Sequence, residues 1–168
     1  GFVETDFIAL FEPSGKVQGP KLRAAIRSLR LAAINPELAT EGIISKHNES
    51  REKVDAAEAD PAIAARLDDP RELFDVKMLT RQIQQECVFP SGGSLKYPEW
   101  GNPDEASYSF CLSMIVRINA VISSTAYACV FDKHDDVVNL TEAIDEFVTD
   151  GEQKLLRICL SGVSFEYH

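Results

Sequence analysis

The sequence is poor in the residues that build catalytic and metal sites. It has three histidines and four cysteines, with no Cys-x-x-Cys pair and no regular Cys/His ligand spacing. It also lacks a glycine-rich phosphate loop with its lysine, and no two of its 27 acidic residues stand out as an acid/base pair. We therefore expect no metal and no cofactor, and a non-enzymatic role is favoured.

Cysteine-dense, turn-rich segments are absent too. The four cysteines all lie in apolar stretches: Cys87, Cys111, Cys129 and Cys159. This pattern is typical of buried free thiols in a reducing compartment, and Cys87, beside Glu86, is predicted to be unreactive. The chain opens at Gly1 without a targeting pattern. A soluble intracellular protein is expected, although sequons at Asn48 and Asn139 leave secretion open.

Long apolar runs are scarce, with one exception. The 22 residues 110–131 carry a single charge, Arg117. Their length would suffice to span a membrane, but Arg117 and Asn119 near the middle would be costly in lipid. The run instead predicts a buried central helix, about residues 103–131, in a mainly α, single-domain helical bundle covering residues 1–168. No membrane contact is expected.

Proline marks the expected helix starts. Four residues that favour helix N-caps directly precede a proline: Asn35, Asp60, Asp69 and Asn102. Together with the spacing of apolar residues, they predict helices over about 20–33, 37–47, 48–59, 61–67, 70–88, 139–148 and 152–160. Residues 2–11 are ambiguous and 163–167 alternate, so an α+β fold in which the two chain ends pair as strands is the alternative.

Charge is distributed unevenly along the chain. Residues 16–30 contain five basic residues and no acidic one: Lys16, Lys21, Arg23, Arg27 and Arg30. Residues 132–152 carry eight acidic residues against one lysine. If these basic and acidic surfaces lie on different faces, they complement each other between molecules. The sequence thus favours a protein-interaction or self-assembly module, with a protein partner or a second copy as its target.

Two other functions remain open. Arg23, Arg27 and Arg30 recur at helical spacing and could bind phosphates in a nucleic-acid-associated structural protein, unless the chain's own acids neutralise them. Arg117 in an apolar helix must be paired. We expect either a buried ion pair with a hydrogen bond to Asn119, or a pocket that binds an anionic ligand in an enzyme or carrier.

One long irregular segment is expected at residues 90–102, which contain three glycines. Loops of this length in compact domains often carry function. Its aromatic residues, Tyr97 and Trp100, are therefore predicted to form an interaction loop.

Overall fold

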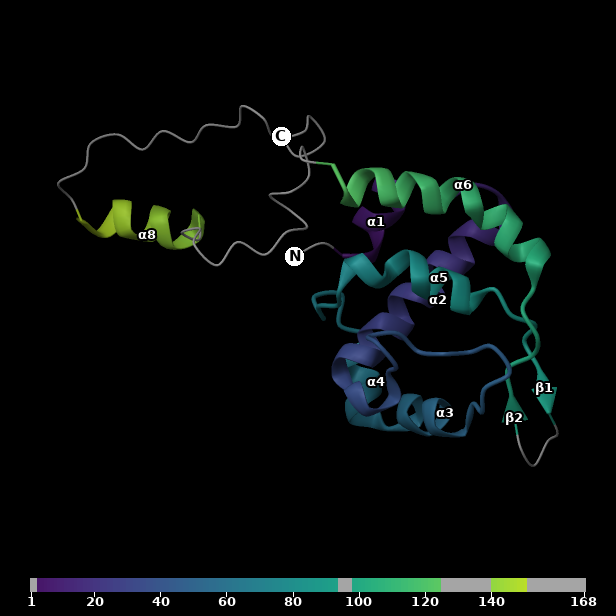
Figure 1. Ribbon diagram of the computed structural model, residues 1–168. Coiled ribbons are helices and arrows are strands. Elements are labelled where there is room, and N and C mark those ends of the chain that lie inside the picture. The colour runs from purple at the N-terminus through teal and green to yellow at the C-terminus, as the bar shows by residue number, and fades with distance from the viewer. Residues whose placement is uncertain (1–2, 94–97, 125–139, 151–168) are drawn as a thin grey trace. The chain divides into compact units, whose positions relative to one another are not determined.

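The computed structural model describes residues 3–93, 98–124 and 140–150. The chain divides into two compact units, residues 1–121 and 122–168 (Figure 1). The fold is mainly helical, which confirms the predicted fold class. The single domain over residues 1–168 stays a prediction.

The first unit contains most of the described helices. In chain order its elements are α1 (Glu4–Phe11), α2 (Gly15–Ile34), η1 (Pro36–Leu38), α3 (Glu52–Ala59), α4 (Pro61–Leu67), η2 (Val76–Met78), α5 (Leu79–Glu86), β1 (Gly92–Gly93), β2 (Pro98–Glu99) and α6 (Glu105–Ile122). β1 and β2 form a short antiparallel pair.

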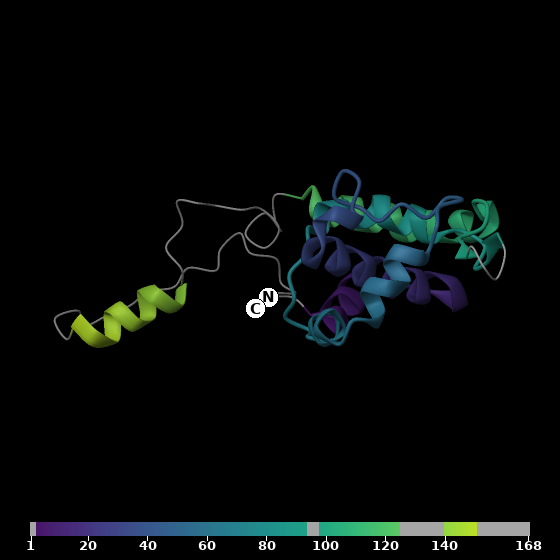
Figure 2. The same cartoon turned by 90° about the horizontal axis from the view of Figure 1, so that it is seen from below.

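Helix α2 is the centre of this unit. It packs against α5, α4, η1 and α1, and Figures 1 and 2 both show it running beside α5. Leu22, Ile26 and Leu29 recur on its inner stripe and are at most 2% exposed. The helix predicted over about 20–33 is therefore found, but it begins earlier, at Gly15, and contains Pro20, and Ala33 near its end is exposed.

Helix α6 confirms a helix within the predicted 103–131 segment, but its burial is one-sided. Cys111, Met114 and Ile118 are fully buried at spacings of three and four residues. Phe110 and Val116 are 63% and 66% exposed. The prediction of a buried central helix is wrong for these positions, because a helix that is apolar on most sides does not reveal which side meets a neighbour. Residues 125–131 lie outside the described residues.

The four Asn-Pro and Asp-Pro pairs, expected to mark helix starts, lie at the beginning of different structures. The side chain of Asp60 accepts hydrogen bonds from the N–H groups of Ala62 and Ile63 and caps α4, as predicted. Asn35 precedes only the short η1, and Asp69 closes a local turn with the N–H of Arg71. Before α6, the N–H of Ser107 bonds to Asp104 rather than to Asn102.

The helix predicted over residues 48–59 begins only at Glu52, and two further predicted helices are also shorter than expected. The segment predicted as a helix over residues 37–47 contains η1 and then a turn in which Glu41 and Gly42 have φ of 51° and 80°. Within residues 70–88 only η2 and α5 are helical, and Leu73, which precedes both, is 71% exposed. Positive φ at two successive residues ends a right-handed helix, which explains the difference at residues 37–47.

The chain start is helical, so the α+β alternative is wrong for residues 4–11, which form α1. The alternating residues 163–167 and the helix predicted over 152–160 lie outside the described residues. In the second unit, α8 (Leu140–Asp150) agrees with the predicted helix over 139–148. Its Glu142, Asp145 and Glu146 are exposed, as is Val148.

Gly101 allows two chain segments to approach closely. A Cβ atom at this position would lie 2.8 Å from the Cβ of Phe89 and 3.1 Å from its carbonyl oxygen. The N–H of Gly101 also donates to that carbonyl. The Gly101→Ala variant should therefore lose about 1–3 kcal/mol of the free energy of unfolding, measured by urea denaturation.

Gly19→Ala is the matched control for this substitution. Gly19 lies within α2, and the nearest atom to an added Cβ is 3.7 Å away, at ordinary contact distance. Alanine is the better helix former, so this variant should be as stable as the parent or more stable. Equal stability of Gly101→Ala and the parent would contradict the close approach.

Candidate functional site

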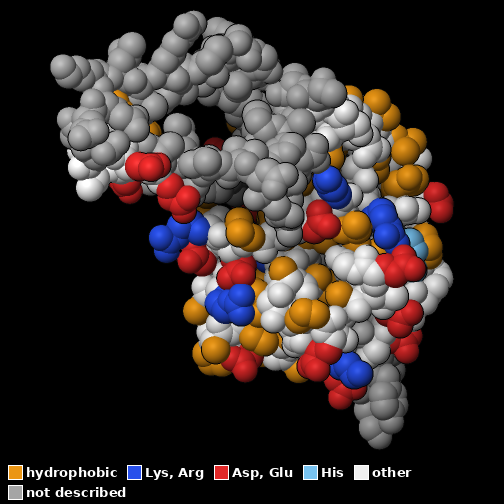
Figure 3. Space-filling view, turned by 60° about the vertical axis from the view of Figure 1, so that its left-hand side comes forward, with side chains coloured by type: hydrophobic (Ala, Val, Ile, Leu, Met, Phe, Trp, Pro, Cys, Tyr) orange, Lys and Arg blue, Asp and Glu red, His pale blue; other side chains and the backbone are white. Residues whose placement is uncertain are grey.

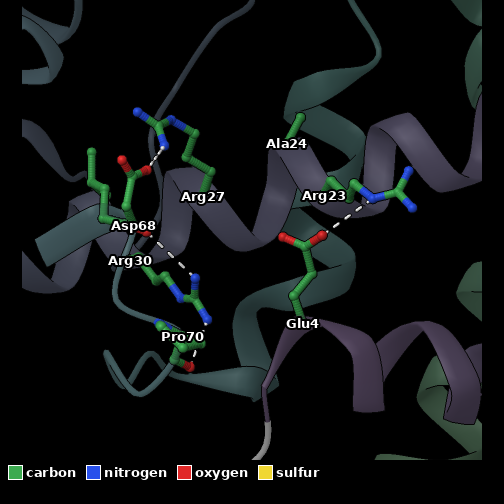
Figure 4. Close-up of a pocket in the computed structure, with 8 residues that line it drawn as sticks. Glu4, Arg23, Ala24, Arg27, Arg30, Asp68 and Pro70 are labelled. Atoms are coloured by element: carbon green, nitrogen blue, oxygen red, sulfur yellow. Dashed lines mark hydrogen bonds and ion pairs between the residues drawn. The ribbon is translucent and has the colours of Figure 1, made fainter. Parts of the chain in front are cut away.

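The predicted arginine stripe lies on α2 and lines a cavity of about 370 Å³ (Figure 4). Arg23, Arg27 and Arg30 form one wall. The other lining residues come from α1, α2, α4 and the segment after α4: Glu4, Ala24, Leu67, Asp68 and Pro70. The helical spacing seen in the sequence thus correctly places the three arginines on one side of α2.

Acidic residues of the same unit neutralise two of these arginines. Arg23 Nε lies 3.2 Å from Glu4 Oε1. Arg27 Nε lies 3.0 Å from Glu58 Oε1, and its Nη1 lies 3.2 Å from Asp68 Oδ1. Both arginine side chains are more than 40% exposed, and such exposed pairs contribute about 0–1 kcal/mol each. They orient α1, α3 and the end of α4 around α2.

Arg30 differs because it is 5% exposed. Its Nη2 donates to the carbonyl of Pro70 at 3.0 Å, and its Nη1 lies 3.5 Å from the carbonyl of Leu67, the last residue of α4. A cation at a helix C-terminus is stabilised by the aligned peptide dipoles. Its Nε is buried without a hydrogen-bond partner in the described part of the chain. Arg30 therefore fastens the end of α4 to α2.

The three guanidinium groups point in different directions (Figure 4). Each one bonds to a wall of the cavity rather than to a shared point, so the arrangement does not form a convergent anion site. Lys21 is turned elsewhere, since its Nζ donates to the carbonyl of Glu86. Lys16 is exposed near the start of α2. Phosphate binding by the stripe stays a prediction, which an RNA mobility shift at low salt would test.

Arg117 lies against the end of α1. Its Nε donates to the carbonyl of Phe11 at 3.2 Å, and its Nη2 donates to the carbonyl of Glu12 at 3.1 Å and to Gln18 Oε1 at 3.3 Å. No acidic side chain among the described residues pairs with it, and Asn119 is exposed. The expected ion pair with a bond to Asn119 is replaced by carbonyl ligands at the C-terminus of α1, which also favours a cation.

Trp100 is not part of an exposed interaction loop. It is 8% exposed and packs with Ala32, Ile44 and Val88. The Nζ of Lys46 lies 5.0 Å from the centre of its ring, within the range of a cation–π interaction. The prediction for Trp100 is therefore wrong, because the segment folds back over the core. Tyr97 lies outside the described residues.

A buried polar cluster around Glu86 was not predicted. Glu86 is 6% exposed. Its carboxylate lies 2.7 Å from the Nζ of Lys46, and it accepts hydrogen bonds from Ser28 Oγ at 2.7 Å and Gln82 Nε2 at 3.0 Å. Gln82 also bonds to both the N–H and the carbonyl of Ile44. The cluster ties the irregular segment near Lys46 to α5 and α2.

The sequence contains one feature that could have indicated this cluster. Gln82 and Glu86 occupy the same helical stripe as Leu79 and Ile83, so polar side chains on a buried stripe of α5 require partners. Their partners come from distant segments, and nothing local indicates Lys46 or Ser28. Because every ligand of the carboxylate is a side chain of this chain, the cluster serves the fold.

The outer face of α6 is the candidate interaction surface. Leu112 and Val116 are 44% and 66% exposed on this face, and Phe110, on another side of the helix, is 63% exposed. Exposed side chains recur along the helix at alternating spacings of three and four residues: Ser109, Leu112, Val116 and Asn119. None of these four residues is charged, and Arg117, which is partly exposed, lies on another side of α6. The face is therefore an uncharged, partly apolar strip.

Charges elsewhere on the described surface are mixed. Figure 3 shows Lys and Arg side chains beside Asp and Glu side chains over the face in view. The separate basic surface expected at residues 16–30 is interrupted by the ion pairs of Arg23 and Arg27. Of the acidic segment 132–152, residues 140–150 are described, as α8, and the others lie outside the described residues.

Two further kinds of site, a metal site and a membrane-spanning helix, were considered for the described part of the chain. Among residues 3–93, 98–124 and 140–150, no three His, Cys, Asp or Glu side chains gather to hold a metal ion. Within that same described part, no helix combines the length and apolar character needed to cross a membrane. No protein-family model matches the chain, and neither the curated proteins nor the solved structures include a significant match.

Proposed function

We propose that the chain is a non-enzymatic self-association module, and that two copies pair through the outer face of α6. The observation that supports this proposal is the exposure of Leu112 and Val116 on one helix face whose exposed residues, Ser109, Leu112, Val116 and Asn119, are all uncharged. Monomeric proteins seldom leave contiguous apolar side chains in water, and such patches mark interaction sites. Self-assembly was also expected from the sequence, but through the basic residues 16–30 and the acidic residues 132–152. The proposal assigns it to the outer face of α6 instead.

A second copy fits this face better than a charged partner. The whole chain has a net charge of −10, so two copies repel each other over most of their surfaces. The strip formed by Ser109, Leu112, Val116 and Asn119 carries no charge, and two identical strips can meet about a twofold axis without repulsion. Leu112 and Val116 would bury apolar surface at the centre of the contact.

The spacing of the exposed residues favours a helix as the partner element. Ser109, Leu112, Val116 and Asn119 follow the alternating three- and four-residue pattern with which two helices pack side by side. The small Ser109 allows the two helices to approach, and a polar residue such as Asn119 in such a seam restricts its register. These features together describe an antiparallel or parallel pair of α6 helices.

Size-exclusion chromatography with light scattering on the full chain tests the proposal. We expect a particle of twice 18.6 kDa that persists at high salt, because an apolar contact is not screened. Pairing of the basic and acidic segments would instead dissociate at high salt. A monomer at both salt concentrations would contradict self-association altogether.

Substitutions locate the contact. The double variant Leu112→Ser/Val116→Ser should be monomeric with an unchanged circular dichroism spectrum, because both side chains are exposed in the single chain. Leu73→Ser is the matched control, since Leu73 is 71% exposed but lies outside α6. A dimer that survives the double variant, or is lost in the control, would place the contact elsewhere.

A further inference from the structure

The exposed strip on α6 is symmetric about its middle. Ser109 and Asn119 each lie five positions from residue 114. Leu112 and Val116 each lie two positions from it. Because an α-helix turns by about 100° per residue, the midline of the strip lies opposite Met114, which is fully buried on the inner face. Followed from either end of α6, the strip therefore runs polar, apolar, apolar, polar.

We propose that the two α6 helices pair antiparallel, so that Leu112 of one copy packs against Val116 of the other and Ser109 meets Asn119. This inference rests on the proposed function, the pairing of two copies through α6, and adds which residues of the second copy each residue contacts. A twofold axis perpendicular to α6 at the height of residue 114 brings both pairs face to face. Each contact is then made twice, as in a closed dimer.

Side-chain size favours this orientation. Each layer of the antiparallel seam joins a larger side chain to a smaller one, Leu112 to Val116 and Asn119 to Ser109. A parallel pair would place every residue against its own copy, so two leucines would hold the helices apart where two serines leave a gap. Evenly filled layers are favoured because protein contacts pack with few voids. The Asn119 amide can also donate a hydrogen bond to the Ser109 hydroxyl of the second copy.

Charge at the start of α6 favours the same orientation. Glu105 is the first residue of the helix, is exposed and continues the strip four positions before Ser109. A parallel pair would bring two Glu105 carboxylates together, along with helix ends of like partial charge. An antiparallel pair separates the two Glu105 residues by about 27 Å along the axis, at 1.5 Å per residue. That separation is well beyond the screening length of about 8 Å in physiological salt.

Cysteine cross-linking of the full chain tests the orientation. The variants are Ser109→Cys, Asn119→Cys and the double variant Ser109→Cys/Asn119→Cys, each oxidised with copper phenanthroline and run on a non-reducing gel. We expect a covalent dimer from the double variant alone. In the antiparallel pair the two copies of residue 109 lie about 15 Å apart along the axis, and a disulfide needs Cα atoms within about 7 Å. The parent chain is the control for the four native cysteines.

The outcomes separate this inference from the proposed function. Covalent dimers from each single variant would indicate a parallel pair, which overturns the antiparallel arrangement and leaves self-association intact. A parent chain that is only monomeric by light scattering would contradict the proposed function, and the inference with it. A dimer by light scattering that gives no link in the double variant would place the contact outside the strip and overturn both.

A charge pair gives a second readout. Leu112→Glu alone and Val116→Lys alone should each be monomeric, because a single charge would be buried at the centre of the contact. An equal mixture of the two variants should form a heterodimer at least about tenfold tighter than either homodimer, since the introduced carboxylate and ammonium face each other only in the antiparallel pair. A mixture that stays monomeric, while the parent is a dimer, would contradict the contact between positions 112 and 116.

Discussion

The Lys46→Met variant is expected to lose about 3–5 kcal/mol of the free energy of unfolding. The substitution keeps an apolar stem but removes the ammonium that lies 2.7 Å from Glu86. The Glu86 carboxylate then remains 6% exposed without a counter-charge. A buried charge that has lost its partner is far more costly than the loss of an exposed ion pair.

A double variant separates the charge from the packing. In Lys46→Met/Glu86→Gln no charge is buried, and the amide oxygen introduced at position 86 can still accept the hydrogen bonds now made by Ser28 and Gln82. Urea denaturation followed by far-ultraviolet circular dichroism should show it to be more stable than Lys46→Met alone. If Lys46→Met loses no more than an exposed pair such as Arg23→Met, the buried ion pair does not stabilise the fold.

Met114→Ala is expected to have the second largest effect. Met114 is fully buried on the inner face of α6 between Cys111 and Ile118. Truncating a buried methionine leaves a cavity and costs about 2–5 kcal/mol. The same measurement on Val116→Ala, a position 66% exposed on the same helix, should give a change within about 0.5 kcal/mol.

The pair of substitutions in α6 tests its one-sided burial. A central helix surrounded on all sides would lose stability at both positions. Equal losses for Met114→Ala and Val116→Ala would therefore contradict the exposed outer face, and with it the surface proposed for self-association. Both substitutions introduce alanine, the best helix former, so a loss of stability at either position cannot come from helix propensity.

Local interactions explain what could be predicted from the sequence. The helix over residues 61–67 is found with its predicted bounds because Asp60 caps it within three residues. The arginine stripe on α2 follows from spacing alone. These features need no knowledge of distant segments, so a single sequence contains the information for them.

Distant contacts explain what could not be predicted. Arg27 pairs with residues 31 and 41 positions away, and Ser28 bonds to Glu86 58 positions away. The run at residues 110–131 is apolar on all sides, so it indicated a helix but did not indicate which face of that helix packs against α2. Partners at such separations are chosen by the folded arrangement, so the pairing of the basic residues and the Glu86 cluster were missed.

The position of Arg117 has a consequence for the order of events during synthesis. The carbonyls that end α1 are bonded by a guanidinium 106 and 105 positions later in the chain. An eight-residue helix is too short to persist in water without tertiary support. Helix α1 would thus be completed only after residue 117 has emerged from the ribosome, and the nascent chain would expose Phe7 and Phe11 to chaperones until then.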